Sequence, residues 1–392
     1  MILLSGGDVV LPDRLLSRGT VAISADRIVD VLPGPVDGAG TRIDLTGHFI
    51  VPGFVDIHVH GLAGHDTLDG ADAVATIASL LPRHGTTAFC PTSIACNPAT
   101  LRRLLTAVRD ARASLARGAA RVLPAHLESN FINPEFKGAQ PLECLRAPRN
   151  QNHAGDFSGR DILDEIAAAR PDVGIVTVAP ELEGAIDLIR DLVQAGHHVS
   201  LGHSGASYDA AMAGIEAGAR QATHLFNRMT PIAHRAPGLA GAVLESEEIA
   251  AELVCDGVHV HPAMMRVALA AKGVERIMAI TDGTAGAGLP AGSRSAIGGR
   301  PITVGDAAYL DDGTIAGSVL TMEKAFAKLV TAIGLSLVEA ATVCATTPAR
   351  ELRLHGLGVI APGALADLAV LDKDLNVVRT YVAGTLAWPT AG

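Results

Sequence analysis

Short apolar runs alternate with longer amphipathic segments from Gly53 to about Gly356, and this alternation limits the choice of fold more than any other feature. Eight of the runs are nearly free of polar residues, which is typical of parallel strands buried on both faces. They are Phe54–Val59, Thr87–Cys90, Val122–Leu127, Gly174–Val178, His198–Leu201, Gln221–Leu225, Ala250–Cys255 and Arg276–Ile280. Eight strands that alternate with helices predict an α/β fold, a (β/α)8 TIM barrel, and a doubly wound open sheet is the alternative.

Segments between these runs show the period of an α-helix. Pro98–Ala116 carries Leu at i, i+3 and i+4 spacing with Arg on the opposite face. Ala185–Ala195 has the same pattern and is followed by Gly196, a typical helix stop. Ser207–Ala217 and Pro262–Ala271 likewise end close to a glycine. We therefore expect helices over these four segments.

The two ends of the chain differ from its middle. Residues 1–52 contain short strands and turns without a helix period, and residues 357–392 resume this pattern. Two β segments that flank a barrel can pair into one small sheet domain. We predict a small β-sandwich domain formed by residues 1–52 and 357–392, and a barrel domain over residues 53–356.

Composition excludes several classes of protein. Of the 392 residues 48% are hydrophobic, so burial can offset the entropy cost of folding, and disorder is excluded. The formal net charge of −10, with no basic run, argues against a nucleic-acid partner. No apolar stretch reaches the roughly 18–20 residues of a membrane span, and Met1–Val10 lacks the positive charge of a signal peptide. Five scattered cysteines without a CxxC pair favour a reducing compartment, so we expect a cytoplasmic location.

Polar residues recur where five of the predicted strands end. In a parallel barrel the catalytic groups lie at the carboxyl ends of the strands. His58 and His60 stand two positions apart on one strand, so their side chains face the same way. Each of the other groups follows a different strand: Glu128, His203, His224 and Asp282. Imidazoles and carboxylates without a thiolate indicate one or two divalent ions, with zinc, iron or a similar metal as candidates.

Other polar groups carry less weight. A second His-x-His pattern, His259–His261, follows the seventh strand, where another metal pair would be redundant. His197 and His198 begin a strand at the end of the barrel opposite the chemistry, which favours a solvent-facing or capping role. Gly283–Gly288 is glycine-rich but lacks the Lys-Ser/Thr of a P-loop. We interpret His126 as a structural residue.

A series of long motifs runs nearly from one end of the chain to the other. They are Pro52–Gly61 (PGFVDIHVHG), His126–Glu128, Leu201–Ser207, Thr223–Pro231 (THLFNRMTP), Asp256–Val260, Ile280–Pro290 (ITDGTAGAGLP), Ile315–Met322 and Gly358–Leu368. In this order they resemble the amidohydrolase superfamily and, within it, the N-acetylglucosamine-6-phosphate deacetylase family. The resemblance implies a metal-dependent hydrolase that removes the acetyl group from N-acetyl-D-glucosamine 6-phosphate, giving D-glucosamine 6-phosphate and acetate.

The resemblance also implies roles for single residues. Glu128, His203 and His224 match the family's core metal ligands, and His58 and His60 match the pair that binds a second ion. Asp282 matches the catalytic aspartate. Positions that match substrate contacts are Gln140, Asn227, Arg228, Arg235, His259, Ile315, Ala316 and Gly317.

Two positions depart from the family pattern. The family usually has Gly-Pro after the metal-binding glutamate, where this chain has Ser129 and Asn130. The family also has a histidine where this chain has Gln140. The side-chain amide of Gln140 can form hydrogen bonds, but unlike a histidine it cannot carry a positive charge. We expect both changes to affect substrate recognition, including the need for a phosphate, and to leave the metal ligands complete.

The resulting hypothesis is a hydrolysis in which metal-activated water attacks the acetyl carbon. Asp282 takes the proton of the water and passes it to the departing amine. Arg235 matches an arginine that contacts phosphate across a dimer interface, which implies a homodimer. Two alternatives stay open. One is an amidohydrolase acting on N-acetylgalactosamine 6-phosphate or on another N-acyl amino sugar or amino acid, and the second is a non-catalytic barrel used for binding or assembly. The complete ligand set argues against the second.

Overall fold

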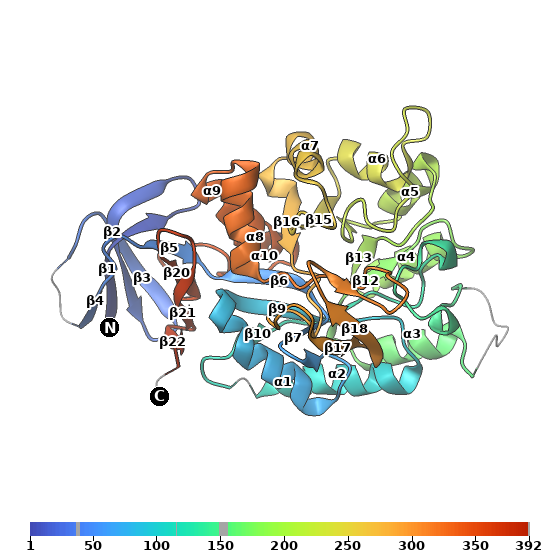
Figure 1. The fold of residues 1–392 in the computed structure, drawn as a ribbon, viewed down its shortest axis with the longest axis horizontal. Coiled ribbons are helices and arrows are strands. Elements are labelled where there is room, and N and C mark those ends of the chain that lie inside the picture. The colour runs from blue at the N-terminus through green and yellow to red at the C-terminus, as the bar shows by residue number, and fades with distance from the viewer. Residues whose placement is uncertain (37–39, 115, 149–155, 391–392) are drawn as a thin grey trace.

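The fold consists of a helix-covered barrel beside a sheet built from both ends of the chain (Figure 1). The structure is a computed structural model, and it describes residues 1–36, 40–114, 116–148 and 156–390. The predicted fold class, a (β/α)8 barrel with a β-sandwich formed by both termini, is confirmed. Within the described residues, no helix is both long enough and apolar enough to cross a membrane.

Eight parallel strands form the barrel wall in the order in which they occur along the chain. They are β6 (Phe54–Val59), β9 (Thr86–Ser93), β11 (Ala125–Leu127), β12 (Val173–Val178), β13 (His198–Leu201), β14 (Gln221–Ala222), β15 (Ala250–Val254) and β16 (Ile277–Ile280). The wall closes between β16 and β6. There the Asp282 N–H donates to the His58 carbonyl at 3.0 Å, and Val59 forms a parallel bridge with Gly283.

Some predicted strands differ in length from the observed ones. The run predicted at Val122–Leu127 is split into β10 (Arg121–Val122) and β11 by Pro124, which has no N–H to donate. The run predicted at Gln221–Leu225 is a strand only over β14, because the chain turns sharply at His224 and Phe226, where φ is +30° and +77°. These turns direct the end of the strand into the barrel mouth.

Helices cover the outside of the barrel and connect successive strands (Figure 1). They are α1 (Ala71–Leu80), α2 (Pro98–Ala113), α3 (Gly159–Ala168), α4 (Ala185–Gln194), α5 (Tyr208–Glu216), α6 (Gly238–Glu245), α7 (Pro262–Lys272), α8 (Met322–Lys328), α9 (Leu337–Ala341) and α10 (Thr347–Glu351). The four predicted helices are confirmed as α2, α4, α5 and α7. Wider helical turns at Leu329–Ile333 and Thr342–Thr346 follow α8 and α9.

The second sheet joins the two ends of the chain. Its order is β22-β21-β20-β5-β1-β2-β3, with β4 beside β1. The strands are β1 (Ile2–Val10), β2 (Leu15–Ser24), β3 (Arg27–Leu32), β4 (Thr41–Asp44), β5 (Phe49–Pro52), β20 (Leu368–Leu371), β21 (Val377–Val382) and β22 (Thr385–Trp388). Antiparallel pairing of β20 with β5 connects the ends, and Leu4, Ile50, Leu368 and Tyr381 share one apolar core. This sheet supports the proposed boundaries, residues 1–52 with 357–392 and residues 53–356.

A three-stranded sheet after β16 was not predicted from the sequence. It consists of β17 (Arg294–Ile297), β18 (Arg300–Val304) and β19 (Ala308–Tyr309). Gly298 and Gly299 form its first turn with φ of +52° and +79°, values that glycine adopts without steric cost. The sheet packs against Ile94 at the carboxyl end of β9, so it adds a wall beside the barrel mouth.

Candidate active site

The predicted metal ligands and the predicted catalytic aspartate lie together at the carboxyl end of the barrel. They come from five strands and are His58, His60, Glu128, His203, His224 and Asp282. All six residues are buried. Residues far apart in the sequence thus meet at one point, as the alignment of strand ends in a parallel barrel requires.

Glu128 is at the centre of a first cluster. Its Oε1 atom lies 2.7 Å from the Nε2 atoms of both His203 and His224, and these two nitrogens lie 3.0 Å apart. Three ligand atoms this close, two nitrogens and one oxygen, can surround one divalent cation. This geometry supports the proposal that the three residues are metal ligands.

A second cluster adjoins the first through the same glutamate. The Nε2 atoms of His58 and His60 lie 3.1 Å apart, and Asp282 Oδ1 lies 3.5 Å and 3.3 Å from them. Glu128 Oε2 lies 3.6 Å from His60 Nε2. Because Glu128 reaches both clusters, the donor set suits two neighbouring ions as well as one.

Three of these residues adopt a backbone conformation that is uncommon outside glycine. The φ angles are +47° at His203, +30° at His224 and +50° at Asp282. Such angles cost energy for residues with a Cβ and concentrate at functional sites. At each strand end the chain therefore bends sharply, and the side chain turns toward the common centre.

Buried charges hold this cluster together. Burial alone would raise the pKa of Glu128, but His203 and His224 hold it well below its usual value. Burial disfavours the charged form of His58, yet the carboxylates of Glu252 and Asp282 raise its pKa to about 10. In the metal-free protein, protons lie between the carboxylate oxygens and the imidazole nitrogens. A divalent cation would bind to the same oxygen and nitrogen atoms and release these protons. The residues therefore fit a metal.

Glu252 supports the second cluster from below and was missed by the sequence reasoning. It is fully buried on β15, and its Oε2 accepts hydrogen bonds from His58 Nδ1 at 2.9 Å and from the His224 N–H at 3.1 Å. Its Oε1 accepts from Gln221 Nε2. The proton on Nδ1 leaves Nε2 of His58 free for a metal. The sequence did contain a signal for this role, because Glu252 stands inside an apolar run. A buried carboxylate needs buried hydrogen-bonding partners.

Replacement of Glu252 by glutamine is expected to weaken metal binding by about 10- to 100-fold. A carboxylate accepts all three donors, whereas an amide has one oxygen and would turn its NH2 group toward one of them. Metal titration of the dialysed protein measures the effect. Glu247→Gln, at an exposed position, is the control, and unchanged metal affinity in Glu252→Gln would contradict this role.

A cavity of about 410 Å³ opens above the two clusters. Most of the residues predicted to bind substrate line it: Gln140, Asn227, Arg228, His259, Ile315, Ala316 and Gly317. Arg235 does not; it is exposed on the loop before α6. Its role as a substrate contact therefore depends on a second subunit and stays a proposal.

Gln140 makes a contact that the sequence reasoning did not predict. Its side chain is buried; Oε1 accepts from the Ala95 N–H at 2.7 Å, and Nε2 donates to Glu128 Oε2. The amide orientation is fixed by the Ala95 bond, because only an oxygen accepts there. Gln140 thus holds one oxygen of the central glutamate in addition to lining the substrate cavity.

The other departure from the family pattern lies outside the cavity. Ser129 Oγ donates to the Thr177 carbonyl at 2.5 Å. Asn130 Nδ2 donates to the carbonyls of Cys96 at 2.8 Å and Cys144 at 2.7 Å. Neither residue lines the cavity. These contacts argue against the expected direct effect of Ser129 and Asn130 on substrate recognition and indicate that they stabilise the loop.

Two other histidines have defined surroundings. His259 Nδ1 lies 2.5 Å from Asp256 Oδ2, which leaves Nε2 for a ligand at the cavity wall. His126 is buried, with Nδ1 3.0 Å from the Ile57 carbonyl and Nε2 3.0 Å from Thr177 Oγ1. Both ring nitrogens of His126 are therefore occupied, in agreement with a structural role.

Comparison with known proteins gives relatives over nearly the whole chain. The chain is 34% identical over 365 residues to the N-acetylgalactosamine-6-phosphate deacetylase of Escherichia coli O157:H7, covering 93% of each sequence. It is 31% identical to the N-acetylglucosamine-6-phosphate deacetylase of Bacillus subtilis (strain 168), covering 97% of this chain and 95% of the relative.

A solved structure has the same fold. It is a mutant N-acetyl-D-glucosamine-6-phosphate deacetylase from Mycobacterium smegmatis in complex with N-acetyl-D-glucosamine-6-phosphate, with a TM-score of 0.89 and 35% identity. The similarity covers 98% of this chain and 99% of that one. The sequence profile described as "Amidohydrolase family" matches residues 49–387, a range that includes every strand of the barrel and both histidine–carboxylate clusters. The chain therefore belongs to the amidohydrolase family.

Proposed function

We propose that this protein removes the acetyl group from N-acetyl-D-glucosamine 6-phosphate to give D-glucosamine 6-phosphate and acetate. The observation that carries the proposal is the pair of histidine–carboxylate clusters sharing Glu128 at the base of a 410 Å³ cavity. A cavity of that volume accommodates a sugar phosphate. Relatives with this activity in their names, 31–35% identical over most of the chain, support the substrate.

The proposed cofactor is one or two divalent ions per subunit, with zinc, iron or a similar metal as the candidates. Glu128, His203 and His224 would hold one ion, and His58 and His60 would hold a second. A bound ion of this kind would lower the pKa of a water molecule to about 7 and would polarise an amide carbonyl. Imidazole and carboxylate ligands suit both zinc and ferrous iron.

Asp282 is assigned the proton transfers. Its carboxylate accepts a proton from the water that attacks the acetyl carbon, and it donates this proton to the sugar nitrogen as the C–N bond breaks. The products are the free amine and acetate. Buried His58 and His60 lower the pKa of Asp282 against the raising effect of burial, which keeps the carboxylate ready to accept a proton.

The sugar phosphate is assigned to the outer part of the cavity. Gln140 and His259 would orient the substrate, and Arg228 and Asn227 would meet the sugar phosphate beside the segment 315–317. Arg235 would contact the phosphate from the other subunit of a homodimer, through the paired hydrogen bonds that guanidinium forms with phosphate. The five cysteines are free, which supports a cytoplasmic location.

Deacetylation of N-acetyl-D-glucosamine 6-phosphate is expected to exceed that of N-acetyl-D-glucosamine by at least about 100-fold in kcat/KM, because the charged groups assigned to phosphate would be left without a partner. Acetate release by the metal-loaded protein measures both rates. Equal rates with and without the phosphate would contradict the phosphate assignment.

A second candidate substrate is N-acetylgalactosamine 6-phosphate. A relative named for this substrate is 34% identical and covers 93% of the chain. The two sugars differ only in the configuration at C4, and the same acetate assay with both sugar phosphates distinguishes them. A higher kcat/KM for the galactose isomer would replace the first proposal while leaving the metal and Asp282 assignments unchanged.

A further inference from the structure

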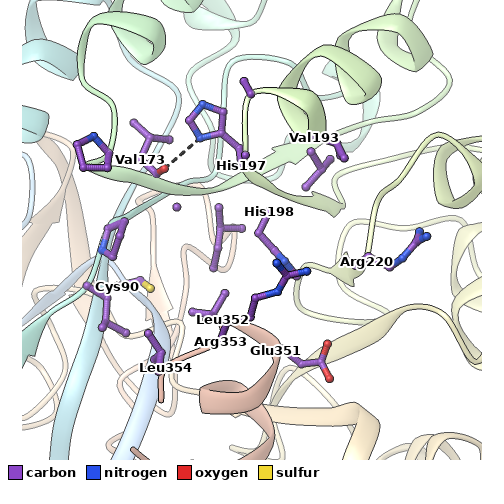
Figure 2. A pocket seen from close by; sticks show the side chains of 18 of the residues that line it. Cys90, Val173, Val193, His197, His198, Arg220, Glu351, Leu352, Arg353 and Leu354 are labelled. Carbon is purple, nitrogen blue, oxygen red and sulfur yellow. Dashed lines mark hydrogen bonds between the residues drawn. The ribbon is translucent and has the colours of Figure 1, made fainter. Parts of the chain in front are cut away.

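A second cavity lies at the amino ends of the barrel strands, opposite the active site. Figure 2 shows this cavity from close by. Its volume is about 940 Å³, and it shares no lining residue with the cavity above the metal clusters. It is lined by the starts of β12 and β13, the segments before β14, β15 and β16, and the end of α10 with the residues after it. We call it the basal cavity. It has no part in the proposed deacetylation.

Arginines concentrate around the basal cavity. Five line it, Arg170, Arg220, Arg276, Arg350 and Arg353, against two carboxylates, Glu248 and Glu351. This local excess of positive charge contrasts with the formal net charge of the whole chain, which is −10. A concave surface with an excess of positive charge raises the local concentration of small anions.

The carboxylates neutralise only part of this charge. Arg220 pairs with Glu248 at 3.1 Å, while Arg276 and Arg350 share Glu351 at 3.4 Å and 3.0 Å.

The two remaining arginines, Arg170 and Arg353, are exposed. Across the described ranges of the chain, neither guanidinium has a hydrogen bond or an ion pair. Two positive side chains are therefore available to a ligand.

His198 adds an unused polar atom in the same place. Its Nε2 is buried and has no hydrogen-bond partner among the residues that the structure describes. Figure 2 shows His198 with Arg220 and Arg353 around the cavity. Burial and the charges of these two arginines lower the pKa of His198 against the raising effect of Glu351. A neutral imidazole can donate to or accept from a bound molecule.

We propose that the basal cavity binds a small metabolite carrying more than one phosphate group. Guanidinium groups match phosphate oxygens with paired hydrogen bonds, and a single phosphate would leave part of the arginine charge unpartnered. A volume near 940 Å³ lies within the range of small-molecule sites. The amino-terminal end of a (β/α)8 barrel usually contributes to stability and not to ligand binding. In this protein it carries a second ligand site.

The test is calorimetric binding of fructose 1,6-bisphosphate and of inorganic phosphate to the metal-loaded full chain. The bisphosphate is expected to bind more tightly than phosphate. The double variant Arg170→Gln/Arg353→Gln is expected to weaken bisphosphate binding at least about tenfold, because it removes two charged donors. Its kcat for deacetylation, measured without the bisphosphate, stays at the wild-type value.

Arg18→Gln is the matched control. Arg18 is exposed on the terminal sheet and has φ +54°, against φ +55° at Arg353, so both substitutions meet the same backbone conformation. This control keeps wild-type bisphosphate affinity. Unchanged affinity in the double variant, or an equal loss in Arg18→Gln, overturns the proposal. Circular dichroism melts confirm that the compared proteins are folded.

Discussion

Replacement of Asp282 by asparagine is expected to lower kcat by about 100- to 10,000-fold, the contribution of a positioned general acid–base group. Asparagine keeps the size of the side chain but can neither take a proton from water nor return one to the sugar nitrogen. Acetate release under saturating substrate measures the loss.

Metal content and melting temperature of the Asp282→Asn protein separate this effect from a loss of ligands or of fold. Asp282 Oδ1 is 3.3 Å from His60 Nε2, so some weakening of the second ion is compatible with the assignment. The first ion would be held by Glu128, His203 and His224, which this substitution leaves unchanged, so it should stay. Asp312→Asn, at an exposed turn, is the control. Near-wild-type turnover in Asp282→Asn would disprove the proton-transfer role.

Glu128→Gln is expected to lose both metal and activity, with turnover reduced at least about 1000-fold, because a metal supplies several kcal/mol of transition-state stabilisation. The two carboxylate oxygens of Glu128 reach both clusters, at 2.7 Å from His203 and 3.6 Å from His60. An uncharged amide lacks the negative charge that would help to hold a divalent cation in either cluster. Elemental analysis of the purified protein measures the metal.

Glu143→Gln serves as the matched control, because Glu143 is exposed on the neighbouring loop and outside the cavity. It should keep full metal content and activity. A Glu128→Gln protein with wild-type metal content would show that the histidines alone hold the ions and that Glu128 has another role.

The positions of the strand ends could be read from the sequence, because an apolar run and the polar residue that ends it are adjacent in the chain. Parallel strands in one barrel then bring those ends together, so His58 and His224 could be expected to meet. The meeting of these side chains at one end of the barrel follows from the local pattern together with the barrel topology.

Contacts within the barrel interior could not be read in this way. Glu252 meets His58 because of the register across the closed wall, which no local pattern encodes. Gln140 meets Glu128 because a loop folds back over the barrel mouth, and the Ala95 N–H fixes the direction of its amide. The basal cavity likewise depends on where α10 ends beneath the strands.

The pairing of β20 with β5 has a consequence for synthesis on the ribosome. Strand β5 ends at Pro52, and its partner β20 begins at Leu368, more than 300 residues later. At elongation rates of about 5–20 residues per second, the edge of β5 that pairs with β20 stays unpaired for roughly 15–60 seconds. Throughout that interval the growing chain exposes an unpaired strand edge, which is a template for association with other chains. In the folded protein β20 covers this edge, so its exposure is confined to synthesis.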